Sequence, residues 1–289
     1  MGAPKCGTTA MNDFLAQHPA IFMAQKEIHY FGSDLKMRSR PTKEEYLQNF
    51  STAPPGTKVV GEASVWYLYS HNAAREIHDF CPEARILIML RNPVEVLYSL
   101  HSQHLYNYNE DERDFKKALS LDSERMQGRN LPDSVDFAET PPYLGSVSFS
   151  SQVARYLEVF GPQQVHIILY DDFKKDPRRE VEATVAFLGL EPWTGFDFRI
   201  VNPNKKIRFW YLHRILKRPP VWLKRFIRML IPIKKIRHFM MGSLFKVNIY
   251  FKKRKTLDED LRKELTQSLF EEVSRLAALI GRDLSAWTD

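Results

Sequence analysis

Cysteine is scarce in this chain, and long apolar runs are absent. Only Cys6 and Cys81 occur among the 289 residues, which is too few for a disulfide framework and lacks the spacing of metal ligands. No run of 18 apolar residues is present to predict a membrane-spanning helix, and no signal peptide is recognisable. We therefore expect a cytoplasmic protein without a bound metal, although two cysteines do not exclude a secreted one.

Acidic residues are missing from one long segment. Residues 198–257 contain 18 Lys and Arg but neither Asp nor Glu, which leaves 24 basic against 35 acidic residues in the rest of the chain. The net charge of +7 therefore belongs to this basic segment. We expect it to face phosphates, an acidic carrier or an anionic membrane surface, with solvated basic helices as the alternative. It has no recognisable nucleic-acid motif, so we do not expect nucleic acid as a partner.

Short apolar runs alternate with helical patterns along the chain. The runs at 59–60, 86–90 and 165–170 predict buried parallel strands. Helices are predicted to begin at capping residues or prolines, namely at Thr8 or Thr9, Pro93, Asp176 and Asp258. The last of these helices is predicted to run unbroken to Ile280. The alternation predicts an α/β fold, a P-loop-like parallel sheet with helices on both faces, in a single domain over residues 1–289.

One polar segment interrupts this pattern. Residues 107–145 show weak periodicity and include Pro132, Pro141 and Pro142. A long stretch of this kind within a compact domain is often functional. We therefore predict a lid or an acceptor-side insertion there, outside the core.

The chain begins with a glycine-rich stretch that is almost a phosphate-binding loop. In a Walker A loop the lysine follows the second glycine, but here Thr8 takes that place after Gly7, and Lys5 lies inside the loop. Backbone N–H groups, the hydroxyls of Thr8 and Thr9 and the ammonium of Lys5 suit a bound oxyanion. No nearby Asp repeats the usual Mg²⁺-holding arrangement, which disfavours a nucleoside triphosphatase. Since almost nothing precedes the loop, we expect that the natural beginning of the chain is trimmed, disordered or excised.

Two more clusters carry titratable or phosphate-binding side chains. Glu27 and His29 are two residues apart, so an extended backbone would place both on one side, and either could be a general base near the loop. Arg91 ends a predicted strand, and Ser99 lies about two turns into the next helix. An arginine at that edge of a parallel sheet suits a phosphate.

A further set is assigned, as a weaker prediction, to the acceptor cleft. Its members follow the predicted strand at 59–60 or lie on the helix after Pro93, and each could equally belong to the core: Glu62, Trp66, Tyr67, His101 and His104.

Together these motifs resemble the sulfotransferases that use 3′-phosphoadenosine 5′-phosphosulfate (PAPS). The loop at 4–9 is similar to their 5′-phosphosulfate loop, the stretch 91–99 to their 3′-phosphate element, and the stretch 201–208 to the loop that closes over the nucleotide. The resemblance implies a set of cofactor-binding residues, namely Lys5, Cys6, Gly7, Thr8, Thr9, Arg91, Ser99, Lys205, Lys206 and Arg208. The stretch 26–31 resembles the heparan-type and bacterial branch, in which the glutamate is the catalytic base. That residue is Glu27 here, with His29 as the alternative base and Lys5 beside the leaving group.

The resemblance thus predicts transfer of a sulfuryl group from PAPS to an acceptor hydroxyl, which leaves 3′-phosphoadenosine 5′-phosphate (PAP). The acceptor could be a carbohydrate, a lipid, a small metabolite or a carrier-bound acyl chain. Two other functions stay open. A P-loop nucleotide kinase would use ATP with Mg²⁺, which the misplaced lysine disfavours. A non-catalytic basic module would bind nucleic acid or an anionic membrane with steep salt dependence, and it would have no use for Glu27.

Overall fold

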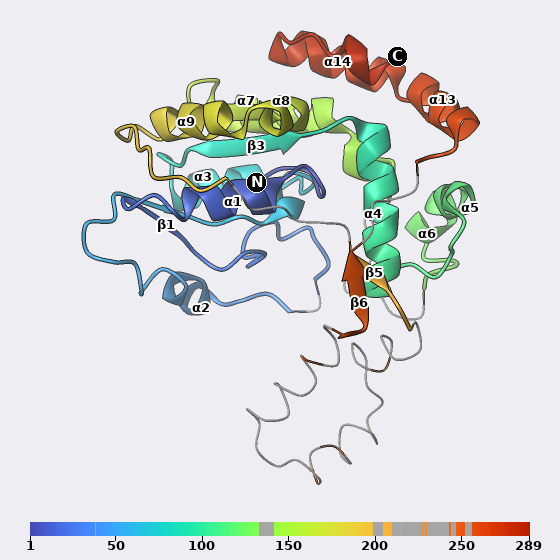
Figure 1. Ribbon diagram of the computed structural model, residues 1–289, viewed down its shortest axis with the longest axis horizontal. Helices are drawn as coiled ribbons and strands as arrows, with labels where there is room; N and C mark the ends of the chain where they lie inside the picture. The colour runs from blue at the N-terminus through green and yellow to red at the C-terminus, as the bar shows by residue number, and fades with distance from the viewer. Residues whose placement is uncertain are drawn as a thin grey trace.

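The computed structural model describes residues 1–37, 39–132, 142–198, 205–209, 247–251 and 256–289, with four isolated positions between 210 and 246. Its described part contains short strands among helices (Figure 1). The strands are β1 (Ile21–Met23), β2 (Val59–Gly61), β3 (Ile86–Leu90), β4 (Val165–Leu169), β5 (Lys205–Ile207) and β6 (Ile249–Phe251). The helices are α1 (Thr8–Leu15), α2 (Lys43–Gln48), α3 (Ala73–Phe80), α4 (Pro93–Asn107), α5 (Phe115–Ser120), α6 (Asp122–Met126), α7 (Phe149–Phe160), α8 (Tyr170–Lys175), α9 (Pro177–Phe187), α13 (Glu259–Ser268) and α14 (Phe270–Ile280), with short 3₁₀ turns η1 (Val65–Tyr67), η2 (Gly145–Val147) and η3 (Ser285–Trp287).

Two parallel strand pairs form the frame. β3 pairs with β4 over its full length, and β1 pairs with β2. In Figure 1, α7, α8 and α9 lie on one side of β3, and α1 and α3 lie on the other. Apolar side chains of β3 are almost fully buried between these layers, as parallel strands covered on both faces require. The predicted α/β class, a parallel sheet with flanking helices, is confirmed.

The beginning of the chain lies beside β3. Gly2 forms an isolated parallel bridge with Met89, and the N–H of Ala3 donates to the carbonyl of Met89. The following turn therefore starts at the edge of the sheet and leads directly into α1. This is the strand-loop-helix order that a phosphate-binding loop needs.

Most helix starts were predicted correctly from local sequence signals. The side chain of Asn92 caps α4 ahead of Pro93, and that of Asp176 caps α9 ahead of Pro177. The prediction that Thr8 or Thr9 caps the first helix is wrong, because Gly7 is the N-cap and no side chain caps α1. The prediction of one long C-terminal helix is also wrong, because the chain breaks at Leu269 between α13 and α14.

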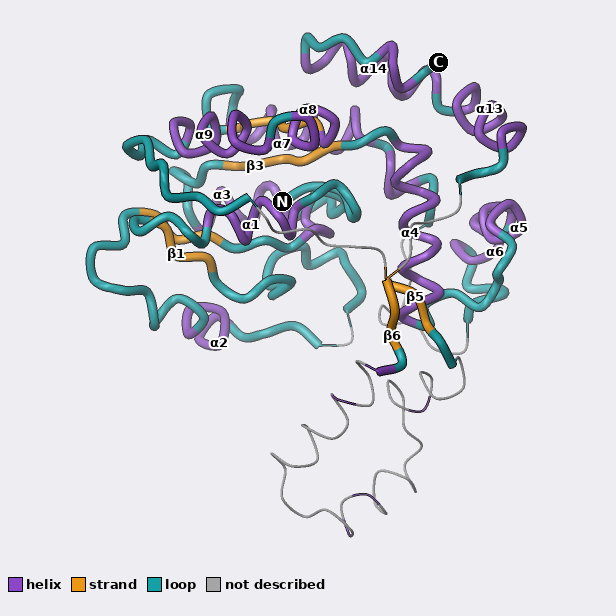
Figure 2. Tube along the Cα trace, viewed as in Figure 1, coloured by secondary structure: helices purple, strands orange, loops and turns teal. Residues whose placement is uncertain are grey.

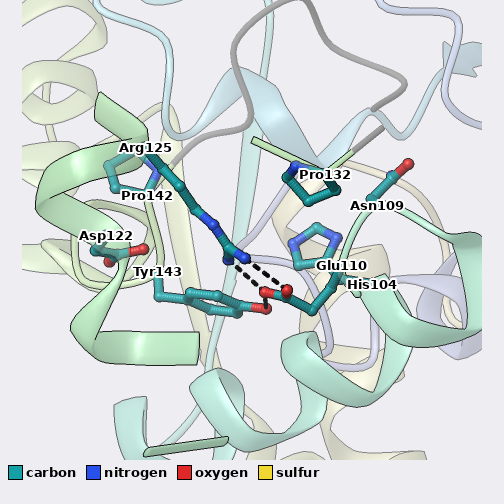
Figure 3. Close-up of a pocket in the computed structure, with 8 residues that line it drawn as sticks. All are labelled: His104, Asn109, Glu110, Asp122, Arg125, Pro132, Pro142 and Tyr143. Atoms are coloured by element: carbon teal, nitrogen blue, oxygen red, sulfur yellow. Dashed lines mark hydrogen bonds and ion pairs between the residues drawn. The ribbon is translucent and has the colours of Figure 1, made fainter. Parts of the chain in front are cut away.

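The segment 107–145 is partly core, contrary to the prediction. Phe115, Ala118 and Tyr143 are buried in the main apolar cluster. The buried carboxylate of Glu110 receives Arg125 Nη2 at 2.7 Å and the hydroxyl of Tyr143 at 3.0 Å (Figure 3). These contacts join the chain before α5 to α6 and to the chain before η2. A lid role for the segment stays a prediction.

The C-terminal part returns to the sheet. The indole of Trp287 donates to Asp171 at 2.7 Å, and Arg262 on α13 pairs with Glu95 on α4 at 2.5 Å. β5 and β6 pair antiparallel and bring together the two ends of the basic segment, most of which lies outside the described residues. Among the residues described, none of the helices combines the length and the apolar character needed to cross a membrane.

Candidate active site

The glycine-rich loop forms a turn at the start of α1. Gly7 has φ 90, and a Cβ there would lie 3.0 Å from the ring of Tyr170. Lys5 also adopts a left-handed backbone, with φ 71. The first turn of α1 has no acidic residue and no side-chain cap, so its N–H groups and the positive end of the helix favour an anion.

Cys6 faces the core in this loop. Its side chain is fully buried, and its N–H is bonded to the carbonyl of Ala3. Burial raises the pKa of the Cys6 thiol. We therefore do not retain Cys6 among the groups that contact a ligand, although the sequence motif includes it.

A lysine that the sequence analysis did not single out lies beside the loop. Lys26 Nζ donates to Thr8 Oγ1 at 3.3 Å and to Thr9 Oγ1 at 3.1 Å. The same atom lies 3.8 Å from Glu27 Oε1. The only signal in the sequence was its position directly before Glu27, and a lone lysine at a surface loop is too common to stand out.

Glu27 and His29 are in direct contact, but the extended backbone that was expected to place them on one side is not present. Glu27 Oε2 lies 3.1 Å from His29 Nε2 and accepts from the N–H of Val65 at 3.2 Å. Both residues have left-handed backbones, with φ 60 and φ 54. Burial raises the pKa of Glu27, but the hydrogen bond and charge of His29, with smaller contributions from Lys26 and the Val65 N–H, outweigh it and leave the pKa lowered.

Residues that follow β2 hydrogen-bond to the loop that carries Glu27 and His29. The N–H of His29 donates to Ser64 Oγ at 3.1 Å, and Ser64 Oγ donates to Glu62 at 2.8 Å. The hydroxyl of Tyr67 accepts from the N–H of Tyr30 at 2.8 Å. Burial raises the pKa of the Glu62 carboxyl. Glu62 and Tyr67 therefore brace the loop that carries the candidate base.

An open cleft of about 500 Å³ lies in front of Glu27 and His29. Its other walls come from the long loop between β1 and α2 (Figure 2), including Gln25 and Met37, and from Glu45 of α2 and its C-cap Asn49. None of the five residues assigned to the acceptor cleft lines it. Trp66 and Tyr67 are buried in the core, and Glu62 is half-buried behind Ser64, so we assign these three a supporting role in place of acceptor contact.

The two histidines of α4 lie elsewhere. His101 Nε2 lies 2.8 Å from the carbonyl of Glu112, and its ring packs against Phe115. His104 lines the small buried cavity around Glu110 (Figure 3), which measures about 10 Å³. Both histidines belong to the packing of the 107–145 segment, so we do not retain them as acceptor residues.

Arg91 lies at the carboxyl end of β3, next to the loop. Its Nη1 donates to the carbonyl of Lys5 at 3.3 Å, and its guanidinium lies 4.7 Å from the centre of the Tyr170 ring. Its Nη2 pairs with Glu95 at 3.3 Å. Ser99 is buried about two turns into α4, one turn beyond Glu95. The structure thus places Arg91 beside the backbone of the loop at Lys5.

The predicted closing loop is only partly described. Lys205 and Lys206 belong to β5, but their side chains lie outside the described residues. Arg208 is exposed, and its N–H donates to the carbonyl of Asn248 at 2.9 Å. In the described part of the chain, no group of three or more His, Cys, Asp or Glu is arranged to hold a metal ion.

Comparison with known proteins gives a consistent family. A family model described as "Sulfotransferase domain" matches residues 1–196. The crystal structure of a sulfotransferase from Alicyclobacillus acidocaldarius is similar, with 29% identity and a TM-score of 0.72 over 100% of this chain and 97% of that chain.

Two curated relatives are similar over part of their length. The bifunctional heparan sulfate N-deacetylase/N-sulfotransferase 1 of Caenorhabditis briggsae is 26% identical over 225 residues, 70% of this chain and 25% of the relative. Human carbohydrate sulfotransferase 15 is 28% identical over 246 residues, 66% of this chain and 43% of the relative. The chain therefore spans less than half the length of either relative.

Proposed function

Because the chain belongs to the sulfotransferase family, as its motifs predicted, we propose that it moves a sulfuryl group from PAPS to an acceptor hydroxyl with Glu27 as the base. One observation carries the proposal. Lys26 contacts the hydroxyls of Thr8 and Thr9 and lies 3.8 Å from Glu27, so the anion-binding turn and the candidate base form one continuous group. A P-loop kinase would carry its lysine directly after Gly7, where this chain has Thr8.

The turn suits a phosphosulfate. It combines an uncapped helix start, two threonine hydroxyls and the ammoniums of Lys5 and Lys26. Arg91 and Ser99 on the neighbouring element would hold the 3′-phosphate. When bound, PAPS supplies a sulfuryl group on a phosphate leaving group: the acceptor oxygen bonds to sulfur, and the bond from sulfur to the bridging oxygen breaks with its electron pair leaving on PAP.

The side chains of the site divide the remaining work. Glu27 takes the acceptor proton, and its lowered pKa keeps it ionised at neutral pH and ready to accept. The Val65 N–H and His29 hold its carboxylate in position. Lys5 and the N–H groups of the turn stabilise charge on the departing oxygen, and loss of such a donor typically costs about 10²–10³ in rate.

The acceptor would enter through the cleft in front of Glu27. Its walls mix polar groups such as Gln25 and Ser39 with apolar ones such as Met37. Relatives named for heparan sulfate and carbohydrate favour a sugar acceptor, although one of them is named as an N-sulfotransferase. We propose a sugar hydroxyl, with lipid, small-metabolite and carrier-bound acyl hydroxyls as the other classes. An acidic acceptor or carrier facing the basic segment is part of the same proposal.

Calorimetric titration of the purified protein with PAP, beside ATP with Mg²⁺, tests the donor. We expect PAP to bind in the micromolar range, ATP to bind more weakly, and a Lys5→Ala/Arg91→Ala variant to lose PAP binding. Tighter binding of ATP with Mg²⁺ would support a kinase. No binding of either nucleotide by the folded protein would contradict the proposal and turn attention to the partners of the basic segment.

A further inference from the structure

Lys26 lies beside both the phosphate loop and the candidate base. Its side chain is only 19% exposed. Its Nζ lies 3.3 Å from Thr8 Oγ1 and 3.1 Å from Thr9 Oγ1, both in the first turn of α1. On its other side, Glu27 Oε1 lies 3.8 Å away. The ammonium is therefore placed between the first turn of α1 and Glu27, which lies 18 residues beyond Thr9 in the chain.

This placement opposes the usual electrostatics of a helix. The N-terminal end of a helix carries partial positive charge and favours acidic side chains. α1 has none in its first turn, and a lysine lies there in their place. Burial lowers the pKa of Lys26, although nearby carboxylates, with Glu27 first, favour its charged form. The ammonium therefore has one anionic neighbour, Glu27, and lies at a helix end that favours a further anion.

We propose that Lys26 binds the peripheral oxygens of the sulfuryl group, so that it is a further catalytic residue beside Lys5; this inference rests on the proposed function. Displacement at sulfur places the acceptor oxygen opposite the departing phosphate oxygen, so the sulfuryl group lies between the base and the 5′-phosphate. The order of contacts in the structure is the same: threonine hydroxyls, Lys26, then Glu27. The loop holds the phosphate, and Lys26 holds the group that is transferred.

Binding of two nucleotides that differ only in the sulfuryl group tests the proposal without an acceptor. PAPS and PAP are titrated calorimetrically into the intact protein and into Lys26→Met, Lys26→Arg and Lys58→Met variants. Lys58 is an exposed lysine directly before β2 and serves as the matched control. Thermal unfolding of each variant establishes that it is folded before titration.

We expect Lys26→Met to weaken PAPS binding roughly 10- to 100-fold while PAP binding changes by less than about threefold, because only PAPS loses a charge-assisted hydrogen bond. Lys26→Arg should retain most of the preference for PAPS, and Lys58→Met should match the intact protein. Equal losses for both nucleotides in Lys26→Met, or no loss for either, would overturn the proposal. If the intact protein binds neither nucleotide, the proposed function itself fails, which is a different result from a failure of Lys26 alone.

Discussion

Arg91 is predicted to recognise the 3′-phosphate, and this can be measured before any acceptor is known. Its guanidinium is held by stacking on Tyr170 at 4.7 Å, by the Lys5 carbonyl at 3.3 Å and by Glu95 at 3.3 Å. A hydrogen bond to a charged group contributes about 1.5–3 kcal/mol, which corresponds to roughly 10- to 150-fold in affinity. Because Arg91 must share its donors with Glu95, we expect the lower half of that range.

The assay compares PAP with adenosine 5′-monophosphate, which lacks only the 3′-phosphate. Replacing Arg91 by Ala should weaken PAP by roughly 10- to 50-fold and leave the monophosphate within about twofold, measured by calorimetry at one fixed salt concentration. Arg91→Lys should recover part of the loss, because an ammonium keeps the charge but not the planar fork.

Arg85→Ala is the matched control for this experiment. Arg85 is an exposed arginine just before the opposite end of β3, where it donates to the carbonyl of Phe187. It should bind both nucleotides as the intact protein does. Equal weakening of PAP and the monophosphate by Arg91→Ala would refute the reasoning, since it would mean that Arg91 supports the loop through the Lys5 carbonyl and does not recognise the 3′-phosphate.

Three further predictions concern the base, the buried ion pair and the turn. In a sulfate-transfer assay with an oligosaccharide that the protein accepts, Glu27→Gln should lower kcat/KM about 10²–10⁴-fold, and His29→Asn should lower it less. Because the pKa of Glu27 is lowered, the rate of the intact protein should stay level from about pH 8 to about pH 6. A decline near pH ~6.5, where an imidazole ordinarily titrates, would instead make His29 the base. Arg125→Met leaves the carboxylate of Glu110 buried without its cation. It should lower the free energy of unfolding, measured by urea denaturation, by about 3–5 kcal/mol. Burial opposes ionisation of Glu110, but Arg125 lowers the pKa of Glu110 overall. The stability that this ion pair contributes is therefore present above the ordinary pKa of a carboxyl and is lost as pH falls. If Arg125→Met lowered the free energy of unfolding by less than about 1 kcal/mol at neutral pH, this account would be contradicted. Gly7→Ala should destabilise by about 1–3 kcal/mol and weaken PAP binding, because φ is 90 and an aromatic ring lies 3.0 Å from the new Cβ; unchanged melting would show that the turn can relax.

The frame of the fold was predictable because its signals are local. The apolar runs at 86–90 and 165–170 became β3 and β4, and Asn92-Pro93 and Asp176-Pro177 became helix starts. These signals depend on the residue and its immediate neighbours. The family was predictable for a related reason, since its motifs are short and their spacing along the chain is fixed.

Burial and contact over long distances were not predictable in the same way. The polar composition of 107–145 hid the fact that Tyr143 reaches Glu110 in the core, across 33 residues of chain. Lys26 meets Thr9 across 17 residues, and nothing in the sequence around either residue indicates the other. His101 and His104 were assigned to the acceptor because their type suggested chemistry, whereas the packing of α4 on the following segment decided their role.

Backbone strain provides the last argument for where the site lies. Five residues other than glycine have left-handed backbones in the described part of the chain, and three of them are Lys5, Glu27 and His29. Such a conformation costs on the order of 1–3 kcal/mol at each residue and persists only where the surrounding structure enforces it. Here the N–H of Glu27 is bonded to the Ala63 carbonyl, and that of His29 to Ser64 Oγ, so the chain after β2 holds both residues in place. Glycine would adopt the same backbone at much lower cost. The strained backbone coincides with the contact between Glu27 and His29, and we attribute it to the need to aim these two side chains at the cleft in front of them.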